Sequence, residues 1–238
     1  MNILITGGAS GLGEAITNKL AKDHHNKVFF TYNNSKENAE AIKGTYANAE
    51  AIHCDFRDRF SLDQFIEQID EMSIDVLVNN AISGMVRAHA HKITIEDYQK
   101  SFEQNVLPTI AITNRALKGL RKRRNGKIIT ILSADIIGNP TVGMAEYTAN
   151  KAYLMSMVKQ WATENIKFNV SSMAISPSLM KTNIPLGVDD RIMENIEENH
   201  PLKGLLPIED VAEAIAYFST SSSYTTGINH IINAAEKT

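Results

Sequence analysis

Short apolar runs alternate with longer segments of helical periodicity along most of the chain. This alternation limits the possible folds more than any other feature, because strands separated by helices are typical of a parallel sheet with crossover connections. The predicted strands are Asn2–Thr6, Lys27–Tyr32, Ala51–Asp55, Asp75–Asn79, Lys127–Leu132, Phe168–Ile175 and Ile228–Ile232. The chain is therefore expected to form an α/β domain built on one sheet.

The segments between these runs carry apolar residues at helical spacing. One stripe contains Leu12, Ala15, Ile16 and Leu20, and another contains Leu62, Phe65, Ile66 and Ile69. Further helices are predicted for Thr94–Arg124 with a break at Pro108, for Met144–Asn165 and for Ile208–Ser219. We predict a single-domain, Rossmann-type, doubly wound parallel sheet of about seven strands over residues 1–238, with helices on both faces. The irregular stretch 183–204 is expected to form a mobile substrate flap.

The composition bounds the class of protein without identifying it. The 238 residues carry a formal net charge of −3 at pH 7, which argues against nucleic-acid binding. Cys54 is the only cysteine, so no intrachain disulfide can form and a reducing compartment is expected. No apolar run reaches transmembrane length, and the first residues lack the basic segment of a signal peptide. We expect a cytoplasmic protein without membrane contact, and the histidines show no spacing typical of a metal site.

A glycine-rich turn follows the first predicted strand and leads into the first predicted helix. Residues 6–13 read Thr-Gly-Gly-Ala-Ser-Gly-Leu-Gly. Glycines here let the backbone approach a pyrophosphate, whose charge then meets the N–H groups at the start of the helix. The Gly-x-Gly-x-x-Gly fingerprint would need glycine at Ile16, and the Gly-Lys-Ser/Thr of a P-loop is absent. A purely structural turn is the alternative. The order of strand, turn and helix favours a dinucleotide, with contacts expected from Gly7, Ser10, Gly11, Leu12 and Gly13.

The end of the second predicted strand bears on the choice of nicotinamide cofactor. An Asp or Glu that binds the ribose is expected about 20 residues beyond the glycines. Residues 31–36 read Thr-Tyr-Asn-Asn-Ser-Lys, and the first carboxylate after them is Glu37. A neutral to basic pocket does not repel a 2′-phosphate, so NADP(H) is favoured over NAD(H), although this stretch contains no arginine. Tyr32 and Asn33 are expected to line the adenosine pocket.

Tyr147 and Lys151 form a candidate pair for proton transfer. They lie in a predicted helix, which places the phenol and the ammonium on one face, about 5–6 Å apart at Cβ. A tyrosine has a pKa of about 10, and a cation within about 4–6 Å can lower it by about 1–3 units. Ser133, fourteen residues upstream, would orient the same alcohol or carbonyl oxygen. Tyr32 and Lys36 have the same spacing, but they lie at a strand end and in a loop.

The chain resembles the short-chain dehydrogenase/reductase family, in its compact single-domain form, over nearly its whole length. The resemblance rests on Thr6, Gly7, Gly11 and Gly13 in the turn, and on Asp55, Asn79, Asn80, Ala81, Asn105, Ser133, Tyr147 and Lys151. It implies that Tyr147 is the general acid in reduction and the general base in oxidation. It also implies that Lys151 lowers the pKa of the tyrosine and holds the nicotinamide ribose. Ser133 would bind the reacting oxygen, and Asn105 would hold a water in a proton relay.

The resemblance implies further contacts with the cofactor. They come from Asp55, Phe56, Asn79, Ala81, Tyr147, Lys151, Pro177 and Thr182. Two positions depart from the family pattern: Ile82 stands where glycine is usual, and Ser178 follows Pro177 where Pro-Gly is usual. Neither departure removes a catalytic group, so both bear on the local geometry of the cofactor site.

Several late segments are similar to the bacterial 3-oxoacyl-(acyl-carrier-protein) reductases, in residues 184–186, 201–204, 207–212 and 224–227. The implied function is NADP(H)-dependent reduction of a carbonyl to a secondary alcohol, with a 3-oxoacyl thioester on acyl carrier protein or CoA as substrate. A reductase or dehydrogenase of another small ketone, sugar or steroid alcohol is one alternative. A nucleotide-binding sensor without turnover is another. The family also implies a homodimer or homotetramer built through the two long helices.

A basic run, Arg121-Lys122-Arg123-Arg124, ends the helix predicted for residues 94–124. Cations at this place complement the negative end of a helix dipole. The same run can dock an acidic partner such as an acyl carrier protein. The sequence leaves both interpretations open.

Overall fold

A seven-stranded parallel sheet forms the centre of the molecule, as a computed structural model shows for residues 1–180, 194 and 197–235. The strands lie in the order β3-β2-β1-β4-β5-β6-β7. Their bounds are β1 Asn2–Ile5, β2 Lys27–Tyr32, β3 Ala49–His53, β4 Val76–Asn79, β5 Gly126–Ile131, β6 Val170–Pro177 and β7 Asn229–Ile232. The direction of winding reverses between β1 and β4, and ligands of doubly wound sheets bind at such a switch point. The predicted fold class is confirmed.

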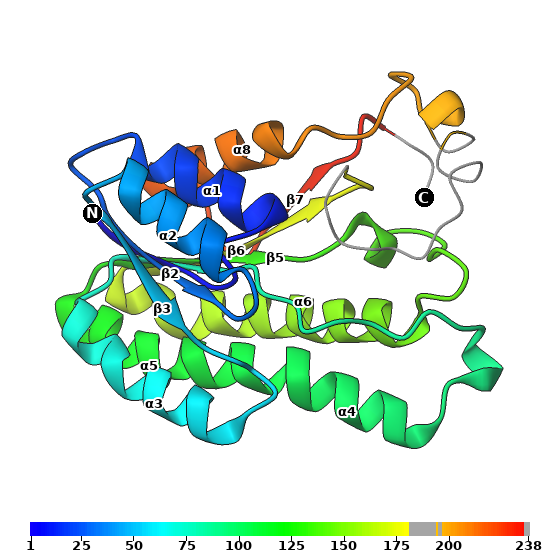
Figure 1. Ribbon diagram of the computed structural model, residues 1–238, viewed down its shortest axis with the longest axis horizontal. Coiled ribbons are helices and arrows are strands. Elements are labelled where there is room, and N and C mark those ends of the chain that lie inside the picture. Colours follow the sequence, from blue (N-terminus) through cyan, green and yellow to red (C-terminus); the bar gives the residue numbers. More distant parts are fainter. Residues whose placement is uncertain (181–193, 195–196, 236–238) are drawn as a thin grey trace.

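Helices cover both faces of this sheet. Figure 1 shows α1, α2 and α8 on one face, and α3, α4, α5 and α6 on the other. Their bounds are α1 Gly11–Ala21, α2 Lys36–Thr45, α3 Arg59–Met72, α4 Ile95–Asn105, α5 Leu107–Arg123, α6 Ala145–Asn165 and α8 Ile208–Thr220. The sequence did not predict α2, because Ala39 and Ile42 are its only buried residues and two positions make no visible stripe.

Two strands are displaced by two residues from their predicted bounds. β3 ends at His53, so Asp55 follows the strand instead of ending it. β6 begins at Val170, because residues 166–168 form a 3₁₀ turn that ends at Asn169 with a left-handed φ of 56°. A turn of this kind has no apolar periodicity and is not visible in the sequence pattern.

The long helix predicted for residues 94–124 is two helices, with the break at Val106. Pro108 lies in the first turn of α5, where its missing N–H would have no intrahelical partner. Thr94 begins α4 with a capping box, in which its hydroxyl accepts from the Asp97 N–H. At the break, the backbone carbonyl of Asn105 accepts the Thr109 hydroxyl at 2.9 Å. The predicted break is confirmed, but it lies at Val106, two residues before Pro108, and it brings Asn105 to a helix end.

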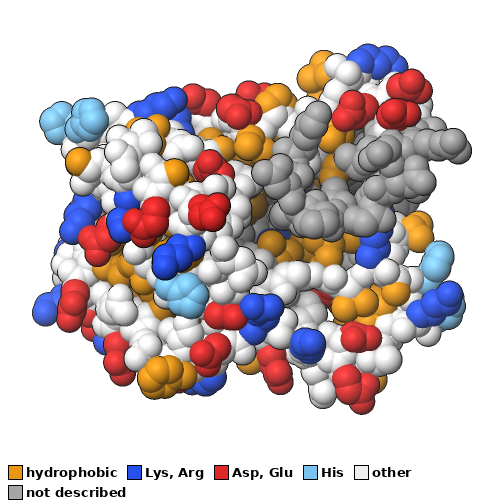
Figure 2. Space-filling view, viewed as in Figure 1, with side chains coloured by type: hydrophobic (Ala, Val, Ile, Leu, Met, Phe, Trp, Pro, Cys, Tyr) orange, Lys and Arg blue, Asp and Glu red, His pale blue; other side chains and the backbone are white. Residues whose placement is uncertain are grey.

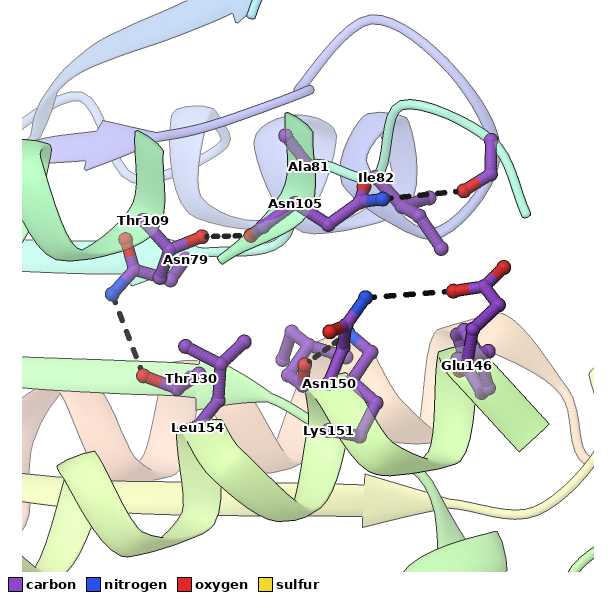
Figure 3. Close-up of a pocket in the computed structure, with 13 residues that line it drawn as sticks. Asn79, Ala81, Ile82, Asn105, Thr109, Thr130, Glu146, Asn150, Lys151 and Leu154 are labelled. Atoms are coloured by element: carbon purple, nitrogen blue, oxygen red, sulfur yellow. Dashed lines mark hydrogen bonds between the residues drawn. The ribbon is translucent and has the colours of Figure 1, made fainter. Parts of the chain in front are cut away.

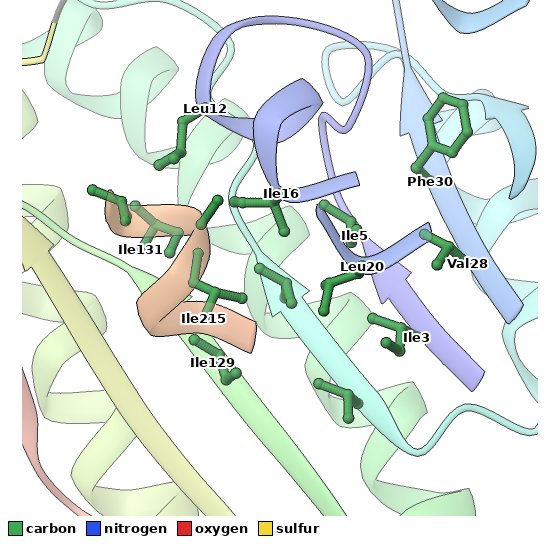
Figure 4. Close-up of a cluster of buried hydrophobic side chains, with 14 of the residues drawn as sticks. Ile3, Ile5, Leu12, Ile16, Leu20, Val28, Phe30, Ile129, Ile131 and Ile215 are labelled. Carbon is green, nitrogen blue, oxygen red and sulfur yellow. The ribbon is translucent and has the colours of Figure 1, made fainter. Parts of the chain in front are cut away.

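The apolar core lies in two layers, one on each face of the sheet. Successive side chains of a strand point to opposite faces, so Ile3 and Ile5 belong to one layer and Leu4 to the other. Figure 4 shows the first layer, where strand residues meet residues of α1 and α8 such as Ile16 and Ile215. Both layers hold the carboxyl ends of the central strands in fixed positions.

Charged side chains of both signs cover the face seen in Figure 2, and neither sign gathers into a broad patch. This distribution agrees with the weak net charge of the chain. Among the described residues, no helix has the length and apolar character needed to cross a membrane.

Candidate active site

A cavity lies at the carboxyl ends of β4 and β5, on the face covered by α4, α5 and α6. It encloses about 380 Å³ between atoms, part of which is open to solvent. Figure 3 shows Ala81, Ile82 and Asn105 on one side, facing residues of α6 on the other. Tyr147 and Lys151 both line this cavity. The fold thus brings three of the four predicted catalytic residues to one place.

Tyr147 and Lys151 lie one turn apart on α6, as their spacing predicts. The Lys151 Nζ is 5.6 Å from the centre of the Tyr147 ring. The same Nζ donates a hydrogen bond of 2.7 Å to the backbone carbonyl of Ile131, at the end of β5. This bond fixes the lysine head against the sheet, and the side chain is only 9% exposed.

Burial is the main cause of the pKa shifts of this pair. The pKa of Tyr147 is raised to about 12, mainly by burial and also by the charges of Asp135 and Glu146, against the lowering effect of a hydrogen bond with Ser133. Burial also lowers the pKa of Lys151 to about 8. The net pKa of Tyr147 is thus raised in this chain without a cofactor, because loss of hydration dominates the shift; the lowering by Lys151 stays a prediction.

Ser133 reaches the site from the turn that follows β5. It has an extended backbone and caps the 3₁₀ turn Ala134–Ile136, accepting from the Asp135 N–H at 3.2 Å. Its hydroxyl is also hydrogen-bonded to the Tyr147 phenol. The predicted serine and tyrosine are therefore neighbours, although fourteen positions separate them in the chain.

Asn105 holds the segment that follows β4. Its Oδ1 accepts from the Ser83 N–H at 2.7 Å, and its Nδ2 donates to the Ser101 carbonyl at 3.1 Å. Two further polar residues of α6 line the same cavity, Glu146 and Asn150. Neither residue was predicted from the sequence, because a glutamate and an asparagine four positions apart in a helix form no known motif.

Four positions of the glycine turn require glycine, either for their backbone conformation or because a side chain would collide with neighbouring atoms. Gly7 and Gly11 have left-handed φ values of +67° and +52°, which glycine adopts without strain. A Cβ on Gly13 would lie 1.9 Å from the Gly7 carbonyl oxygen. A Cβ on Gly8 would lie 2.6 Å from Phe30 and Thr17, so Gly8 is a requirement that the sequence analysis did not name.

The turn is fastened to β4 by Asn80. Its Nδ2 donates to the carbonyls of Thr6 and Gly7 at 3.0 and 3.1 Å, and its backbone N–H donates to the Thr6 hydroxyl at 2.9 Å. Ser10 caps the following helix with an extended backbone, and Leu12 is buried within it. The turn therefore has the cradle shape that a pyrophosphate needs at a helix N-terminus.

A second polar group lies where β2 and β3 end. The Arg57 guanidinium donates to both Asp55 carboxylate oxygens, at 2.9 and 2.8 Å, and holds the pKa of that carboxyl down to about 2. Asn33 is hydrogen-bonded to the same carboxylate. Tyr32 meets His53 edge to face at 5.5 Å. Arg57 thus stands beside the predicted adenosine pocket, which sequence analysis described as lacking an arginine.

The other predicted cofactor residues occupy varied positions. Asn79 turns inward, with its Nδ2 donating to Thr113 at 2.9 Å and lying 3.4 Å from Thr130. Ala81 lines the cavity, and Phe56 is buried. Pro177 ends β6, and the buried hydroxyl of the following Ser178 has no hydrogen-bond partner among the described residues. Thr182 and most of the predicted flap, 183–204, lie outside the described residues.

Metal ligands do not gather in this region. Within residues 1–180, 194 and 197–235, no group of His, Cys, Asp or Glu side chains could hold a metal ion. The histidines His89 and His91 stack on each other at 5.8 Å and are exposed.

The chain matches known proteins over nearly its whole length. The family described as enoyl-(acyl carrier protein) reductase matches residues 7–234. The 3-oxoacyl-[acyl-carrier-protein] reductase FabG of Thermotoga maritima is 30% identical over 233 residues, covering 94% of this chain and 92% of the relative. The 2,3-dihydro-2,3-dihydroxybenzoate dehydrogenase of Bacillus subtilis is 28% identical over 228 residues, covering 90% and 86%.

Solved structures show the same fold. The 3-ketoacyl-(acyl-carrier-protein) reductase from Brucella melitensis complexed with NADH has a TM-score of 0.88 at 25% identity, covering 99% of this chain and 98% of its own. The structure of ElxO with NADP bound has a TM-score of 0.86 at 25% identity, covering 98% and 97%. Fold and matches together define a nicotinamide-dependent oxidoreductase acting on hydroxyl or keto groups. The chain belongs to the short-chain dehydrogenase/reductase family.

Proposed function

We propose that this chain is an NADP(H)-dependent reductase that converts the ketone of a 3-oxoacyl thioester into a secondary alcohol. One observation carries the proposal: Tyr147, Lys151 and Asn105 line one cavity at the carboxyl edge of the sheet, and Ser133 is hydrogen-bonded to the phenol. The domain 1–238 would bind the cofactor as one unit.

The glycine turn fits the pyrophosphate of a dinucleotide, because Gly8 and Gly13 let the turn pack closely against Phe30 and the Gly7 carbonyl and so bring the chain to the N-terminus of α1. When bound, a reduced nicotinamide would supply the hydride. Lys151 would hold the nicotinamide ribose, and its lowered pKa of about 8 still leaves most of the ammonium charged at neutral pH. Pro177 and Thr182 are proposed to line the nicotinamide end.

Tyr147 would donate its proton to the substrate oxygen. With a pKa raised to about 12, the phenol is protonated at neutral pH, which is the form that reduction needs. Ser133 would donate its hydroxyl proton to the same oxygen and keep it beside the phenol. Lys151 would stabilise the phenolate that forms, and Asn105 would connect the lysine through water to solvent.

Two features support NADP(H) over NAD(H). The residues that follow β2 contain Lys36 and no carboxylate before Glu37, and Arg57, after β3, shares the Asp55 carboxylate with Asn33. Both cations suit a 2′-phosphate by their charge, and the Arg57 Nε and Nη2 already donate to Asp55. Similar solved structures contain NADH in one case and NADP in another, so the choice rests on these residues.

The substrate class rests on the relatives named 3-oxoacyl-[acyl-carrier-protein] reductase. The related dehydrogenase of a dihydroxybenzoate precursor favours a second candidate, oxidation or reduction of another small alcohol or ketone. A nucleotide-binding sensor is the third candidate, and tight cofactor binding without turnover on any carbonyl would support it.

The contacts of the basic run at the end of α5 favour a structural role over the docking of an acidic partner. Arg121 stacks on Phe168 at 4.2 Å, and Arg124 ends the helix and donates to the Lys167 carbonyl. This cluster lies near the far end of α6, about 30 Å from Tyr147 at 1.5 Å per residue. A carrier docked there would have to reach beyond the length of α6 to the phenol of the same chain.

Association is proposed through α5 and α6. A groove of about 1050 Å³, open to solvent, runs between them, and its lining combines apolar residues such as Leu117 and Met157 with charged ones such as Arg121 and Glu164. A second copy, as in a homodimer or homotetramer, would cover this mixed surface, and light scattering of the purified chain measures the oligomeric state. A cytoplasmic location stays a prediction from the sequence.

The test is a panel of carbonyl substrates assayed with NADPH and with NADH. Acetoacetyl-CoA should be reduced, and NADPH should be preferred. If small ketones are reduced and the thioester is not, the substrate is a small ketone and the 3-oxoacyl thioester is wrong. Absence of turnover with intact cofactor binding would replace the reductase with the sensor.

A further inference from the structure

Glu146 lines the cavity with a buried carboxylate, and the proposed reaction gives this carboxylate no role. It is 1% exposed and directly precedes Tyr147 on α6. None of the ion pairs among the described residues involves it. A buried carboxylate without a cation is costly unless hydrogen bonds satisfy it. The cost of burying this carboxylate in the cavity wall must therefore be offset by its hydrogen bonds.

Hydrogen bonds from three separate segments converge on this carboxylate. Its Oε1 accepts from the Val86 N–H at 2.6 Å. Its Oε2 accepts from the Ser101 hydroxyl, and Asn150 Nδ2 lies 3.4 Å from it. Asn150 also donates to the Ser101 hydroxyl oxygen at 2.9 Å. Glu146 thus joins α4 and α6 to the segment that follows β4.

This segment, residues 83–88, forms part of the site. It is tied at its start to Asn105 through the Ser83 N–H, and at its end to the Gly143 carbonyl through the Ala88 N–H at 3.2 Å. Ile82 and Gly84, at its beginning, line the cavity beside Tyr147. Figure 3 shows Glu146 and Asn150 pointing from α6 toward the side that carries Asn105 and Ile82. The Glu146 bond at Val86 lies between the two other ties.

The charge of Glu146 also acts on the phenol. The charged groups that face Tyr147 are Lys151 and Glu146 on α6 and Asp135 from the turn after β5. Both carboxylates raise the pKa of the tyrosine and so keep the phenol protonated.

We infer that Glu146 is a positioning residue of the reductase site: its carboxylate clamps residues 83–88 and α4 to the start of α6, and its charge favours the proton-donating form of Tyr147. The inference rests on the proposed role of Tyr147 in the reaction. It assigns a task to a residue outside the four predicted catalytic positions. Ser101 and Asn150 complete the clamp.

The experiment compares Glu146→Gln with Glu67→Gln in the full-length chain. Glu67 is exposed on α3, away from the cavity and from the α5–α6 groove, and serves as the matched control. Reduction of the best substrate from the panel is measured over a pH series. Glu146 is one of the groups that raise the pKa of Tyr147, so without its charge the loss of activity at alkaline pH should begin at a lower pH than in the control. An unchanged alkaline limb in Glu146→Gln would overturn the inference.

Ser101→Ala tests the clamp if Glu146→Gln does not fold. This variant keeps the charge but removes the hydroxyl that links Glu146 to Asn150, so the substrate KM should rise at least about threefold with an unchanged pH profile. An unchanged KM would refute the clamp. Tyr147→Phe is assayed beside them. If that variant keeps full activity, the proposed function fails, whatever the behaviour of Glu146.

Discussion

Two regions of the molecule carry a tyrosine followed four residues later by a lysine, and the fold gives them different surroundings. Tyr32 ends β2 and Lys36 begins α2, so no helical turn joins them, and Lys36 is exposed. Tyr147 and Lys151 share one turn of α6, and Lys151 is held against the end of β5. Burial, rather than spacing, makes the second pair a candidate for proton transfer.

The charged side chains near Tyr32 are partly exposed, whereas those near Tyr147 are buried. At the Tyr32 region the charges of Asp55 and Arg57 pair with each other near solvent, with side chains 22% and 48% exposed. At the Tyr147 region Lys151 and Glu146 are buried and do not pair with each other among the recorded ion pairs. Exposed charges suit recognition of a ligand, whereas buried charges change the pKa of their neighbours.

The largest difference is expected in turnover. Tyr147→Phe removes the proton donor, so kcat should fall by about 10²–10⁴-fold while the affinity for NADPH, measured by fluorescence titration, stays within about twofold. Tyr32→Phe is the matched control and should keep kcat. Equal losses in the two variants would mean that the comparison of the two pairs is wrong.

The next effect concerns stability. The pKa of Lys151 is lowered from 10.5 to about 8, so between these values the unfolded chain binds the additional proton and the free energy of unfolding rises with pH. Urea unfolding should therefore show a rise of about 2–3 kcal/mol on going from about pH 7 to about pH 10 that is absent in Lys151→Met. Lys36→Met is the control and should retain the rise. The raised pKa of Tyr147 acts in the opposite direction, lowering stability only above about pH 10.

A smaller effect is expected for cofactor choice. Arg57→Ala and Lys36→Ala each remove a cation from the adenosine end, so the KM for NADPH should rise about tenfold, which corresponds to about 1.4 kcal/mol, while the KM for NADH stays unchanged. Arg59→Ala provides the control, because Arg59 pairs with Asp63 on α3 instead. If both cofactors weaken equally, these cations serve the fold and not the 2′-phosphate.

The smallest effect belongs to the Asp55–Arg57 pair. Because the pKa of Asp55 is lowered from 3.8 to about 2, its stabilisation is present above about pH 4 and is lost as the pH falls toward 2. Partial exposure reduces its size to about 1 kcal/mol or less. Chemical unfolding of Arg57→Ala at neutral pH should show this loss. A loss of several kcal/mol would place the pair in the core, contrary to its exposure.

Much of the fold and of the site was predictable because its signals are local. Apolar runs mark the strands, and Gly7, Gly11 and Gly13 mark a turn that the backbone demands. The clamp was not predictable, because Ser101 and Glu146 lie 45 positions apart and meet only when α4 packs on α6. The net rise in the pKa of Tyr147 was not predictable for a related reason: spacing places a cation near the phenol but does not report how much water the fold removes.

The crowding at Gly13, where a methyl group would overlap the Gly7 carbonyl, has a consequence for redesign. Gly8 and Gly13, in the turn that would hold the diphosphate, cannot accept a side chain, so these positions cannot be substituted to change coenzyme binding. Preference between the two coenzymes has to be rewritten elsewhere, at Lys36, Arg57 and their neighbours. Binding of the diphosphate, which NAD(H) and NADP(H) share, and recognition of the 2′-phosphate, in which they differ, therefore depend on separate residues of this protein. A coenzyme switch can be attempted without touching residues 6–13.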